Sequence, residues 1–329
     1  MKAAFYTLGC KVNQYETEYM TELLKNAGFE IVSHNEEADY YIINSCTVTA
    51  TADQKTRQNV RKFKRQHPNS AVILTGCMPQ AFPEQAKELF DADIVLSNKN
   101  NDDILNLINE YNINHNRIVK INKHEKGDAF QKCTISGFNE RIRAFVKIED
   151  GCDRFCSYCI IPYARGRVRS RNLEHVLEEV RTLAASGYKE VVLTGIHLSS
   201  YGKERPEEQE NLLTLIQAVH EVDGIERIRL GSLEPGIITK EFAKAISSLP
   251  KVCPHFHLSL QSGCTATLKR MNRRYTAQEY REKCEILRKY YPAPALTTDV
   301  ITGFPGETEE EFEESRSFVD SIHFYETHI

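Results

Sequence analysis

Three cysteines, Cys152, Cys156 and Cys159, form a C-x3-C-x2-C triplet, and this spacing constrains the chain more than any other feature. The triplet comes directly after a strand expected over residues 143–149. Thiolates this close together suit an iron–sulfur cluster with one iron left without a protein ligand, or a zinc ion. A structural zinc site usually has four protein ligands, and no histidine or fourth cysteine lies within a few residues. The spacing therefore favours a [4Fe–4S] cluster over zinc or reduced structural thiols.

The composition places these cysteines in a reducing compartment. The chain has 329 residues, 41% hydrophobic and 27% charged, which is typical of a globular protein of two domains and excludes a fibrous repeat. Its first residues enter a strand pattern without a signal-peptide core, and no apolar run approaches the ~20 residues that cross a bilayer. We expect a cytoplasmic protein with no membrane attachment. Because cytosolic thiols stay reduced, ten cysteines indicate metal binding or catalysis rather than disulfides.

The first part of the chain, residues 1–120, alternates short apolar strands with helices. The strands are expected at 2–8, 40–43, 71–74 and 94–96, and the helices at 14–27, 51–66, 83–90 and 102–111. This alternation predicts an open, mostly parallel α/β sheet as an N-terminal domain. A stretch rich in Asn, Lys and His follows, and we interpret residues 121–140 as a linker.

A second βα series fills residues 141–329. Its strands are expected at 143–149, 191–194, 227–230, 255–260 and 296–301, with helices between them. Thr308 and Glu311 resemble a capping box that opens a further helix. Residues 324–329 resemble the start of a sixth strand. The pattern predicts a partial (β/α)6 barrel truncated at its sixth strand, as in a fragment of a longer protein.

Three further cysteines, Cys10, Cys46 and Cys77, each lie just beyond the carboxyl end of an expected strand and behind a small residue. If those strands are neighbours, the three thiols converge at one rim of the sheet. The alternative is three separate buried cysteines. We favour a second iron–sulfur cluster, again with one iron free of protein ligands. Four cysteines lack metal spacing and are given no metal role: Cys133, Cys253, Cys264 and Cys284.

The C-x3-C-x2-C triplet after the first strand of a partial barrel resembles the radical S-adenosylmethionine (SAM) superfamily, whose open iron chelates SAM. Segments at later strand ends fit that resemblance, because ligands of parallel α/β folds gather at the carboxyl ends of strands. These are VVLTG before Ile196, SLEP after Gly231, SLQSG before Cys264 and VITGFPGE before Thr308. The resemblance implies the following cofactor-binding candidates: Tyr158, Gly195, Ser232, Glu234, Ser259, Gln261, Arg273, Asp299 and Gly303.

Two cysteine triplets in one chain resemble the methylthiotransferases. Residues 7–16 (TLGCKVNQYE) and 160–166 (IIPYARG) match the MtaB-type branch best. That branch acts on tRNA that carries N6-threonylcarbamoyladenosine at position 37, beside the anticodon. Related branches act on isopentenyladenosine in tRNA or on a ribosomal-protein aspartate. Family members normally carry a C-terminal TRAM domain that grips RNA, and no such domain is found in this sequence.

The resemblance implies a transferase with two [4Fe–4S] clusters and SAM as cofactors. One SAM would methylate a sulfur at the cluster on Cys10, Cys46 and Cys77. A second SAM at the other cluster would be cleaved reductively, and the resulting radical would activate C2 of the adenosine for methylthiolation. The reaction needs an external electron donor, of the flavodoxin or ferredoxin type. The alternative from another class is a zinc-bound RNA-binding scaffold without radical chemistry.

The net charge of −4 is unlike that of a typical nucleic-acid binder, but the basic residues are clustered. One expected helix, residues 51–66, carries six of them. A single basic run is often only a solvated helix face. With tRNA as the substrate implied by the resemblance, the candidates for phosphate contacts are Arg57, Arg61, Arg65, Arg141 and Arg143.

Overall fold

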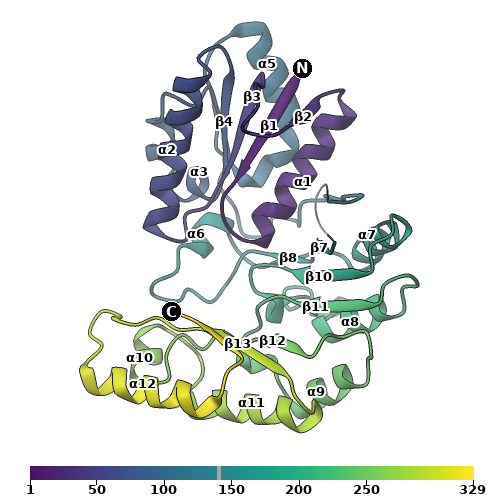
Figure 1. The fold of residues 1–329 in the computed structure, drawn as a ribbon, viewed down its shortest axis with the longest axis vertical. Helices are drawn as coiled ribbons and strands as arrows, with labels where there is room; N and C mark the ends of the chain where they lie inside the picture. Colours follow the sequence, from purple (N-terminus) through teal and green to yellow (C-terminus); the bar gives the residue numbers. More distant parts are fainter. Residues whose placement is uncertain (139–141) are drawn as a thin grey trace. The chain divides into compact units, whose positions relative to one another are not determined.

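The computed structural model describes residues 1–138 and 142–329 and divides them into two compact units (Figure 1). The N-terminal unit contains residues 1–138 together with Ile160–Arg167. The C-terminal unit contains residues 142–159 and Val168–Ile329. No helix in the described part of the chain is both long and apolar enough to cross a membrane.

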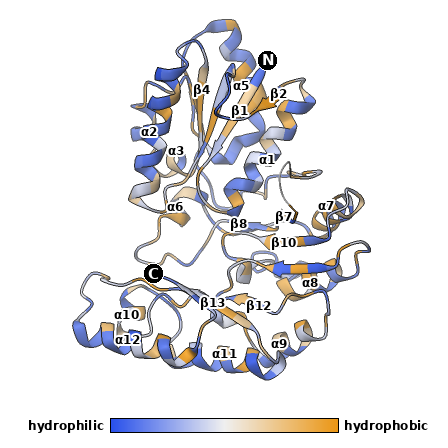
Figure 2. Ribbon diagram, in the orientation of Figure 1, coloured by the Kyte–Doolittle hydropathy of each residue, from blue (hydrophilic) through white to orange (hydrophobic). Residues whose placement is uncertain are grey.

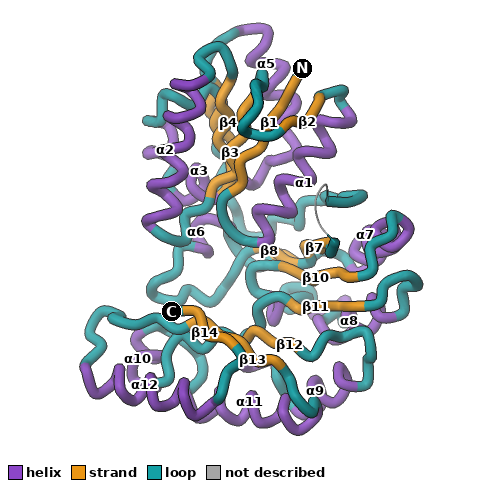
Figure 3. The backbone as a smooth tube through the Cα atoms, viewed as in Figure 1, coloured by secondary structure: helices purple, strands orange, loops and turns teal. Residues whose placement is uncertain are grey.

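The N-terminal unit is built on a six-stranded sheet in the order β2-β1-β3-β4-β5-β6, with every pair parallel. The strands are β1 Lys2–Thr7, β2 Glu30–Val32, β3 Tyr40–Ser45, β4 Ala71–Gly76, β5 Ile94–Leu96 and β6 Ile118–Lys120. Parallel neighbours need crossover connections. These contain the helices α1 Lys11–Asn26, α2 Ala50–Gln66, α3 Cys77–Ala81, α4 Pro83–Lys87 and α5 Ile104–Asn114 (Figure 3). The predicted parallel α/β sheet is confirmed.

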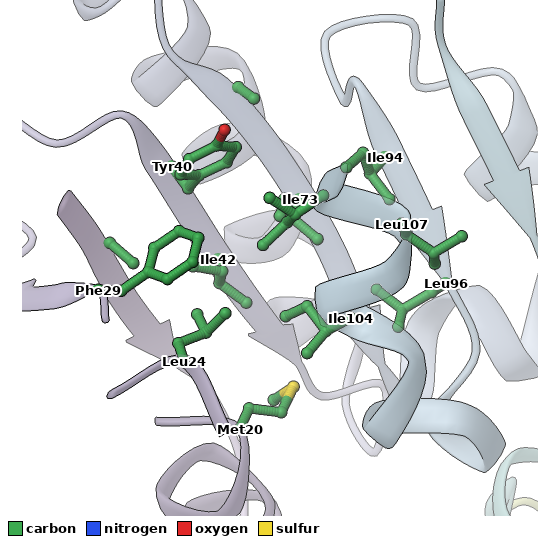
Figure 4. Close-up of a cluster of buried hydrophobic side chains, with 13 residues drawn as sticks. Met20, Leu24, Phe29, Tyr40, Ile42, Ile73, Ile94, Leu96, Ile104 and Leu107 are labelled. Atoms are coloured by element: carbon green, nitrogen blue, oxygen red, sulfur yellow. The ribbon is translucent and has the colours of Figure 1, made fainter. Parts of the chain in front are cut away.

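Hydrophobic side chains pack on both faces of this sheet. As a consequence, β3 and β4 are buried along their whole length. Alternate residues point to opposite faces, so Ile42 and Ile43 belong to different cores. Figure 4 shows the core that α1 and α5 cover, where these side chains meet: Met20, Leu24, Ile42, Ile73, Ile104 and Leu107. On the other face α2 contributes Val60 and Phe63. The rest of α2 is mostly hydrophilic (Figure 2).

The C-terminal unit contains two three-stranded parallel sheets. The first has the order β11-β10-β7, with β7 Ala144–Lys147, β10 Glu190–Thr194 and β11 Arg227–Leu230. The second has the order β12-β13-β14, with β12 His255–His257, β13 Ala295–Asp299 and β14 Glu326–His328. Isolated parallel bridges, Ile228 with Val252 and Leu233 with Leu258, connect the segments around β11 and β12. The strands thus follow one another in chain order, and the segment expected to begin a sixth strand pairs with β13.

Helices follow most of these strands, as the βα pattern predicts. They are α7 Leu173–Ala185, α8 Leu212–His220, α9 Lys240–Ser247, α10 Thr265–Arg270, α11 Ala277–Tyr290 and α12 Glu309–Ile322. The predicted capping box of α12 is confirmed: the backbone N–H of Glu311 donates to Thr308 Oγ1, and the backbone N–H of Thr308 donates to Glu311 Oε2. A short antiparallel pair, β8 Glu149–Asp150 with β9 Arg169–Ser170, flanks the cysteine triplet in sequence.

The chain is distributed over the units differently from the expected boundaries of 1–120, 121–140 and 141–329. Residues 121–138 belong to the N-terminal unit, where the Tyr15 hydroxyl donates to the carbonyl of Cys133 at 3.2 Å and the backbone N–H of Ser136 donates to Glu22 Oε1 at 2.6 Å. The short helix α6 Ile161–Arg165 also belongs to this unit and contacts α3. The sequence pattern did not predict α6, because a helix of five residues is too short to show a helical pattern of apolar residues.

Candidate functional site

Cys10, Cys46 and Cys77 follow three adjacent strands, β1, β3 and β4, at the same edge of the N-terminal sheet. The strand register aligns Thr7 with Asn44, and Asn44 with Thr75, so the three carboxyl ends stop level with one another. The condition on which convergence depended, that these strands are neighbours, is met. The rim of the sheet therefore gathers the three chain segments that carry these thiols.

Two glycines bring the loops close together. Gly9 has φ +111°, and a Cβ on it would lie 2.9 Å from the Cβ of Cys46. Gly76 has φ +95°, and a Cβ on it would lie 2.5 Å from the backbone nitrogen of Ser45. Both the left-handed backbone and the lack of space exclude other residues. The small residues that precede Cys10 and Cys77 in the sequence thus allow close approach to the end of β3.

A buried amide network holds the same rim. The Cys10 thiol donates to Asn13 Oδ1 at 3.3 Å, and Asn13 Nδ2 donates to Asn44 Oδ1 at 3.2 Å and to the carbonyl of Ser45 at 3.1 Å. Asn44 Nδ2 returns a hydrogen bond to the carbonyl of Asn13 at 2.8 Å. Both asparagines are almost fully buried. Sequence reasoning missed them, although each stands within three residues of a candidate ligand.

A buried ion pair completes the rim. Arg165, from α6, donates through Nη1 to Glu16 Oε1 at 2.5 Å and through Nη2 to Glu16 Oε2 at 3.1 Å. Burial raises the pKa of Cys77 to about 12, and the Arg165 charge opposes that rise, while Glu16, Cys10 and Cys46 add to it. Burial likewise raises the pKa of Cys46, again against Arg165. These groups form one electrostatic cluster, in which the metal-free thiols of Cys46 and Cys77 stay protonated at neutral pH.

The donor set at this rim fits an iron–sulfur cluster. All three cysteines are free of disulfides. Within residues 1–138 and 142–329 no three His, Cys, Asp or Glu side chains meet around a single metal ion. Each cysteine of a [4Fe–4S] cluster binds a different iron, so the three thiols need not meet at one point. Thiolates are also the ligands that such clusters take, whereas a single structural zinc ion would need a fourth donor.

The second triplet forms a tight loop in the C-terminal unit. The backbone N–H of Cys159 donates to the carbonyl of Cys156 at 2.9 Å, and Phe155 takes a left-handed backbone with φ +49°. Asn272 Nδ2 donates to the carbonyl of Phe155 at 2.8 Å, and the backbone N–H of Ser157 donates to the carbonyl of Met271 at 3.1 Å. The residues just after α10 therefore hold the loop. Burial raises the pKa of Cys152 to about 12, with Cys159 and Cys156 adding to the rise.

Arg273 connects this loop to the end of another strand segment. Its Nη1 donates to Cys156 Sγ at 3.3 Å, and its Nη2 donates to the carbonyl of Ser259 at 3.3 Å. The guanidinium carbon lies 5.0 Å from the ring centre of Tyr275, whose hydroxyl also donates to the Ser259 carbonyl. Tyr158 lies edge-on to Phe304 at 6.3 Å and is 41% exposed, which leaves an aromatic surface beside the cysteines. The structure thus brings the predicted residues Arg273 and Ser259 together with Cys156.

The other cofactor candidates lie at strand ends in the same unit. Glu234 accepts from Arg154 Nη2 and lies 3.4 Å from His197 Nε2. Burial alone would raise the pKa of Glu234, but His197 and Arg154 outweigh it and lower the pKa. A Cβ on Gly195 would lie 2.8 Å from Glu149 Oε2, so this glycine permits close packing on a buried carboxyl group.

The remaining candidates are less closely gathered. The backbone N–H of Gln261 donates to the carbonyl of Asp299 at 2.9 Å, and Asp299 Oδ2 lies 3.2 Å from His257 Nε2, a hydrogen bond that lowers the pKa of Asp299. Gly303 has φ +69°, and its N–H donates to Glu307 Oε2 at 2.6 Å. Ser232 is exposed. Sequence reasoning missed Arg154, which its position inside the triplet could have indicated.

The candidate RNA contacts differ in their availability. Arg61 and Arg65 are exposed on α2, whereas Arg57 donates to Gln85 Oε1 at 2.6 Å. Arg143 Nη1 lies 3.8 Å from Glu190 Oε1. The fifth candidate, Arg141, lies outside the described residues. Of the candidates within the described residues, Arg61 and Arg65 are therefore the ones that are exposed and form no ion pair there.

Comparison with known proteins gives consistent matches over nearly the whole chain. A model of the radical SAM superfamily matches residues 146–319, and a model described as uncharacterized protein family UPF0004 matches residues 2–97. A Bacillus subtilis relative named threonylcarbamoyladenosine tRNA methylthiotransferase MtaB is 40% identical, over 99% of this chain and 72% of its own length. An Aquifex aeolicus relative of the same name is 40% identical, over 100% of this chain and 80% of its own length.

Other relatives are named for a different substrate, and proteins of known structure share the fold. A Clostridium novyi relative named tRNA-2-methylthio-N(6)-dimethylallyladenosine synthase is 39% identical, over 97% of this chain and 71% of its own length. The radical SAM methyltransferase TsrM from Kitasatospora setae superposes with a TM-score of 0.70 at 14% identity, over 99% of this chain and 72% of that chain. This last match supports the fold alone.

Proposed function

The chain belongs to the radical SAM methylthiotransferases, and we propose that it attaches a methylthio group to C2 of N6-threonylcarbamoyladenosine beside the anticodon of tRNA. The observation that carries this proposal is the presence of two separate cysteine triplets, one at the rim of the N-terminal sheet and one in a loop of the C-terminal unit. Relatives named for this substrate match at 40% identity over almost the entire chain and support the assignment.

Each of the two cysteine triplets has its own role in this proposal. Cys152, Cys156 and Cys159 would hold one [4Fe–4S] cluster, and Cys10, Cys46 and Cys77 would hold the other. When bound, the clusters and SAM supply the electron transfer, the radical chemistry and the transferable methylthio group. The protein positions these groups and excludes water from them. Arg273 orients Cys156 by its hydrogen bond, and the exposed ring of Tyr158 offers an aromatic surface for a base.

The partners follow from the same proposal. Arg61 and Arg65 on α2 would contact tRNA phosphates, because they are exposed and cationic. A reductive reaction that starts from SAM requires an electron from outside the chain, which we assign to a flavodoxin or ferredoxin. A tRNA-modifying enzyme of this kind would work in the cytoplasm.

Iron analysis and nucleoside analysis together test the proposal. Anaerobic reconstitution with iron and sulfide should give about eight irons per chain, as expected for two cubic clusters. Replacing all three cysteines of either triplet by alanine should leave about four irons. Cys253→Ala serves as the control, because this half-buried cysteine lacks metal spacing and should leave the iron content unchanged.

The second arm uses tRNA from a strain that lacks the gene. Mass spectrometry of its nucleosides should show N6-threonylcarbamoyladenosine without the 2-methylthio group, and the wild-type gene should restore the modification. Neither triple variant should restore it. Zinc in place of iron after anaerobic purification would contradict the proposal, and so would loss of a methylthio group only from dimethylallyladenosine.

A further inference from the structure

A cavity of about 210 Å³ opens in the C-terminal unit beside the cysteine loop. Two residues of the loop itself, Asp153 and Arg154, line it together with Lys203, Glu204 and Arg274. All of these belong to the C-terminal unit, so the cavity is complete within that unit. The lining carries three cationic side chains and two carboxylates.

The carboxylate of Glu204 is already engaged. Glu204 Oε2 accepts from the Ser170 hydroxyl at 3.0 Å, Oε1 accepts from the backbone N–H of Ser170, and Arg205 Nε lies 3.8 Å from Oε1. The carboxylate of Glu204 is therefore held by the β9 segment rather than by the cations of the cavity.

The cations, in contrast, retain unused donors. Arg154 donates to Glu234 through Nη2, but its buried Nε has no hydrogen-bond partner in the described part of the chain. Lys203 and Arg274 form no ion pair within residues 1–138 and 142–329. Partial burial and the nearby Arg154 charge lower the pKa of Lys203, with Glu234 opposing them. An anion that enters the cavity would meet the side chains of Lys203, Arg274 and Arg154, and charge-assisted hydrogen bonds to such cations are favourable.

The size of the cavity restricts the ligand. Pockets for drug-sized ligands have volumes of about 300–1,000 Å³, so about 210 Å³ accommodates a substituent rather than a whole nucleoside. The two substituents named among the relatives differ in chemistry. A threonylcarbamoyl group ends in a carboxylate and a hydroxyl, whereas a dimethylallyl group is entirely apolar. Donors that require an anion distinguish between them, because an apolar group would leave these donors unpaired.

We propose that this cavity is the subsite for the carboxylate of the threonylcarbamoyl group, with the cationic side chains of Lys203, Arg274 and Arg154 selecting the anionic substituent over an apolar one. The proposal rests on the proposed function, since it concerns how the same substrate is recognised. Lys203 and Arg274 are exposed at the mouth of the cavity, which allows their replacement without removing buried packing.

The test compares three tRNAs that are identical except at the adenosine beside the anticodon: threonylcarbamoylated, dimethylallylated and unmodified. The variants are Lys203→Gln, Arg274→Gln and the double variant, in fully reconstituted protein. Lys240→Gln is the matched control, an exposed lysine at the start of α9 in the same unit. The readouts are the Kd of each tRNA, the Kd of SAM and the rate of methylthiolation.

Loss of one or two charged hydrogen bonds should weaken binding of the threonylcarbamoylated tRNA by about tenfold to a hundredfold. Binding of unmodified tRNA and of SAM should stay unchanged, and Lys203→Arg should retain most of the affinity. An equal loss for all three tRNAs would identify a phosphate contact and overturn the proposal. Weaker SAM binding would assign the site to the cofactor carboxylate, and unchanged binding throughout would also overturn it.

Failure of the subsite and failure of the proposed function are separable. The wild-type protein decides the function, because it either methylthiolates the threonylcarbamoylated tRNA or does not. The variants decide the subsite, because their effect is measured as the difference in Kd between two tRNAs and needs no turnover.

Discussion

Arg165 and Glu16 are 149 positions apart in the chain and form a two-point ion pair in the interior of the N-terminal unit, with 1% and 4% of their side chains exposed. Arg165 follows the last cysteine of the C-x3-C-x2-C triplet by only six residues, yet its charge acts on Cys46 and Cys77 of the other triplet. The segment after one set of candidate ligands thus forms part of the environment of the other set.

Removing one charge of this pair should be costly. We expect Glu16→Gln to lower the free energy of unfolding by about 3–5 kcal/mol, because the Arg165 guanidinium would remain buried beside a neutral group. Urea unfolding followed by circular dichroism measures the change. Glu30→Gln, at an exposed glutamate 4.0 Å from Lys2, should cost less than ~1 kcal/mol. The double variant Glu16→Met with Arg165→Met should recover most of the loss, and equal effects of Glu16→Gln and Glu30→Gln would contradict the prediction.

Gly76 should tolerate no side chain. Gly76→Ala combines a left-handed backbone, worth about 1–2 kcal/mol, with overlap onto Ser45, which adds roughly 1–3 kcal/mol. Gly28→Ala is the matched control, since Gly28 has φ +87° but open space around its Cα. Gly76→Ala should also reduce the iron bound by the N-terminal triplet, as measured by metal analysis. If the two variants lost the same stability, overlap with Ser45 would not be the cause.

Cys284 should make stability fall with rising pH. This cysteine is completely buried on α11, and burial raises its pKa from 9.0 to about 12. Between these values the unfolded chain has released the proton and the folded chain has kept it, so rising pH favours unfolding. Cys284→Ala should therefore reduce the loss of stability by up to about 1.4 kcal/mol per pH unit above pH 9. Unfolding titrations at about pH 8, 9 and 10 would test this, and identical slopes for both proteins would refute it.

The hydrogen bond from Arg273 to Cys156 Sγ should influence the redox properties of a cluster held there. Hydrogen bonds to sulfur stabilise the reduced state. We expect Arg273→Lys to lower the reduction potential by about 40–60 mV, the equivalent of one hydrogen bond. An anaerobic titration followed by electron paramagnetic resonance measures the potential. Lys269→Arg, an exposed neighbour on α10, should leave the potential unchanged.

Arg61 and Arg65 should contribute to tRNA affinity through charge alone. The double change to glutamine should weaken binding of modified and unmodified tRNA equally, and it should reduce the slope of log Kd against log salt by about one for each phosphate that the variant no longer neutralises. Filter binding between about 50 and 200 mM salt measures the slope. Arg181→Gln on α7, where Arg181 pairs with Glu174, is the control. A slope identical to that of the wild type would remove α2 from the RNA-binding surface.

Local patterns were sufficient to predict the strands and helices that carry the site. The alternation of apolar residues located β1, β3 and β4 closely, and the adjacency of these strands follows from the preference of successive βα units to pair. The capping box at Thr308 was recognisable because both partners lie within one turn. Cysteine spacing indicated the C-x3-C-x2-C triplet, and the position of each remaining ligand candidate just beyond an expected strand indicated the other triplet.

Long-range contacts were not predictable in this way. Asn13 and Asn44 stand 31 positions apart, and nothing in either local sequence indicates that their side chains meet. Polar residues on surface helices are usually solvated, so the α1 sequence alone does not predict that Glu16 is buried. Its burial depends on the ion pair with Arg165, which belongs to a distant segment of the chain. The cavity beside Arg154 likewise combines residues from loops that are separated by 50 to 120 positions, roughly, and only the folded backbone brings them together.

The membership of α6 in the N-terminal unit has a consequence for the order in which the protein can fold during synthesis. The first 138 residues leave the ribosome with every strand of the six-stranded sheet but without the arginine that faces Glu16. Until residue 165 has emerged, the Glu16 carboxylate of the nascent sheet therefore lacks its partner. A chain cut after residue 138 would also lack Arg165. The two units are therefore interleaved along the chain, and a single cut does not separate them.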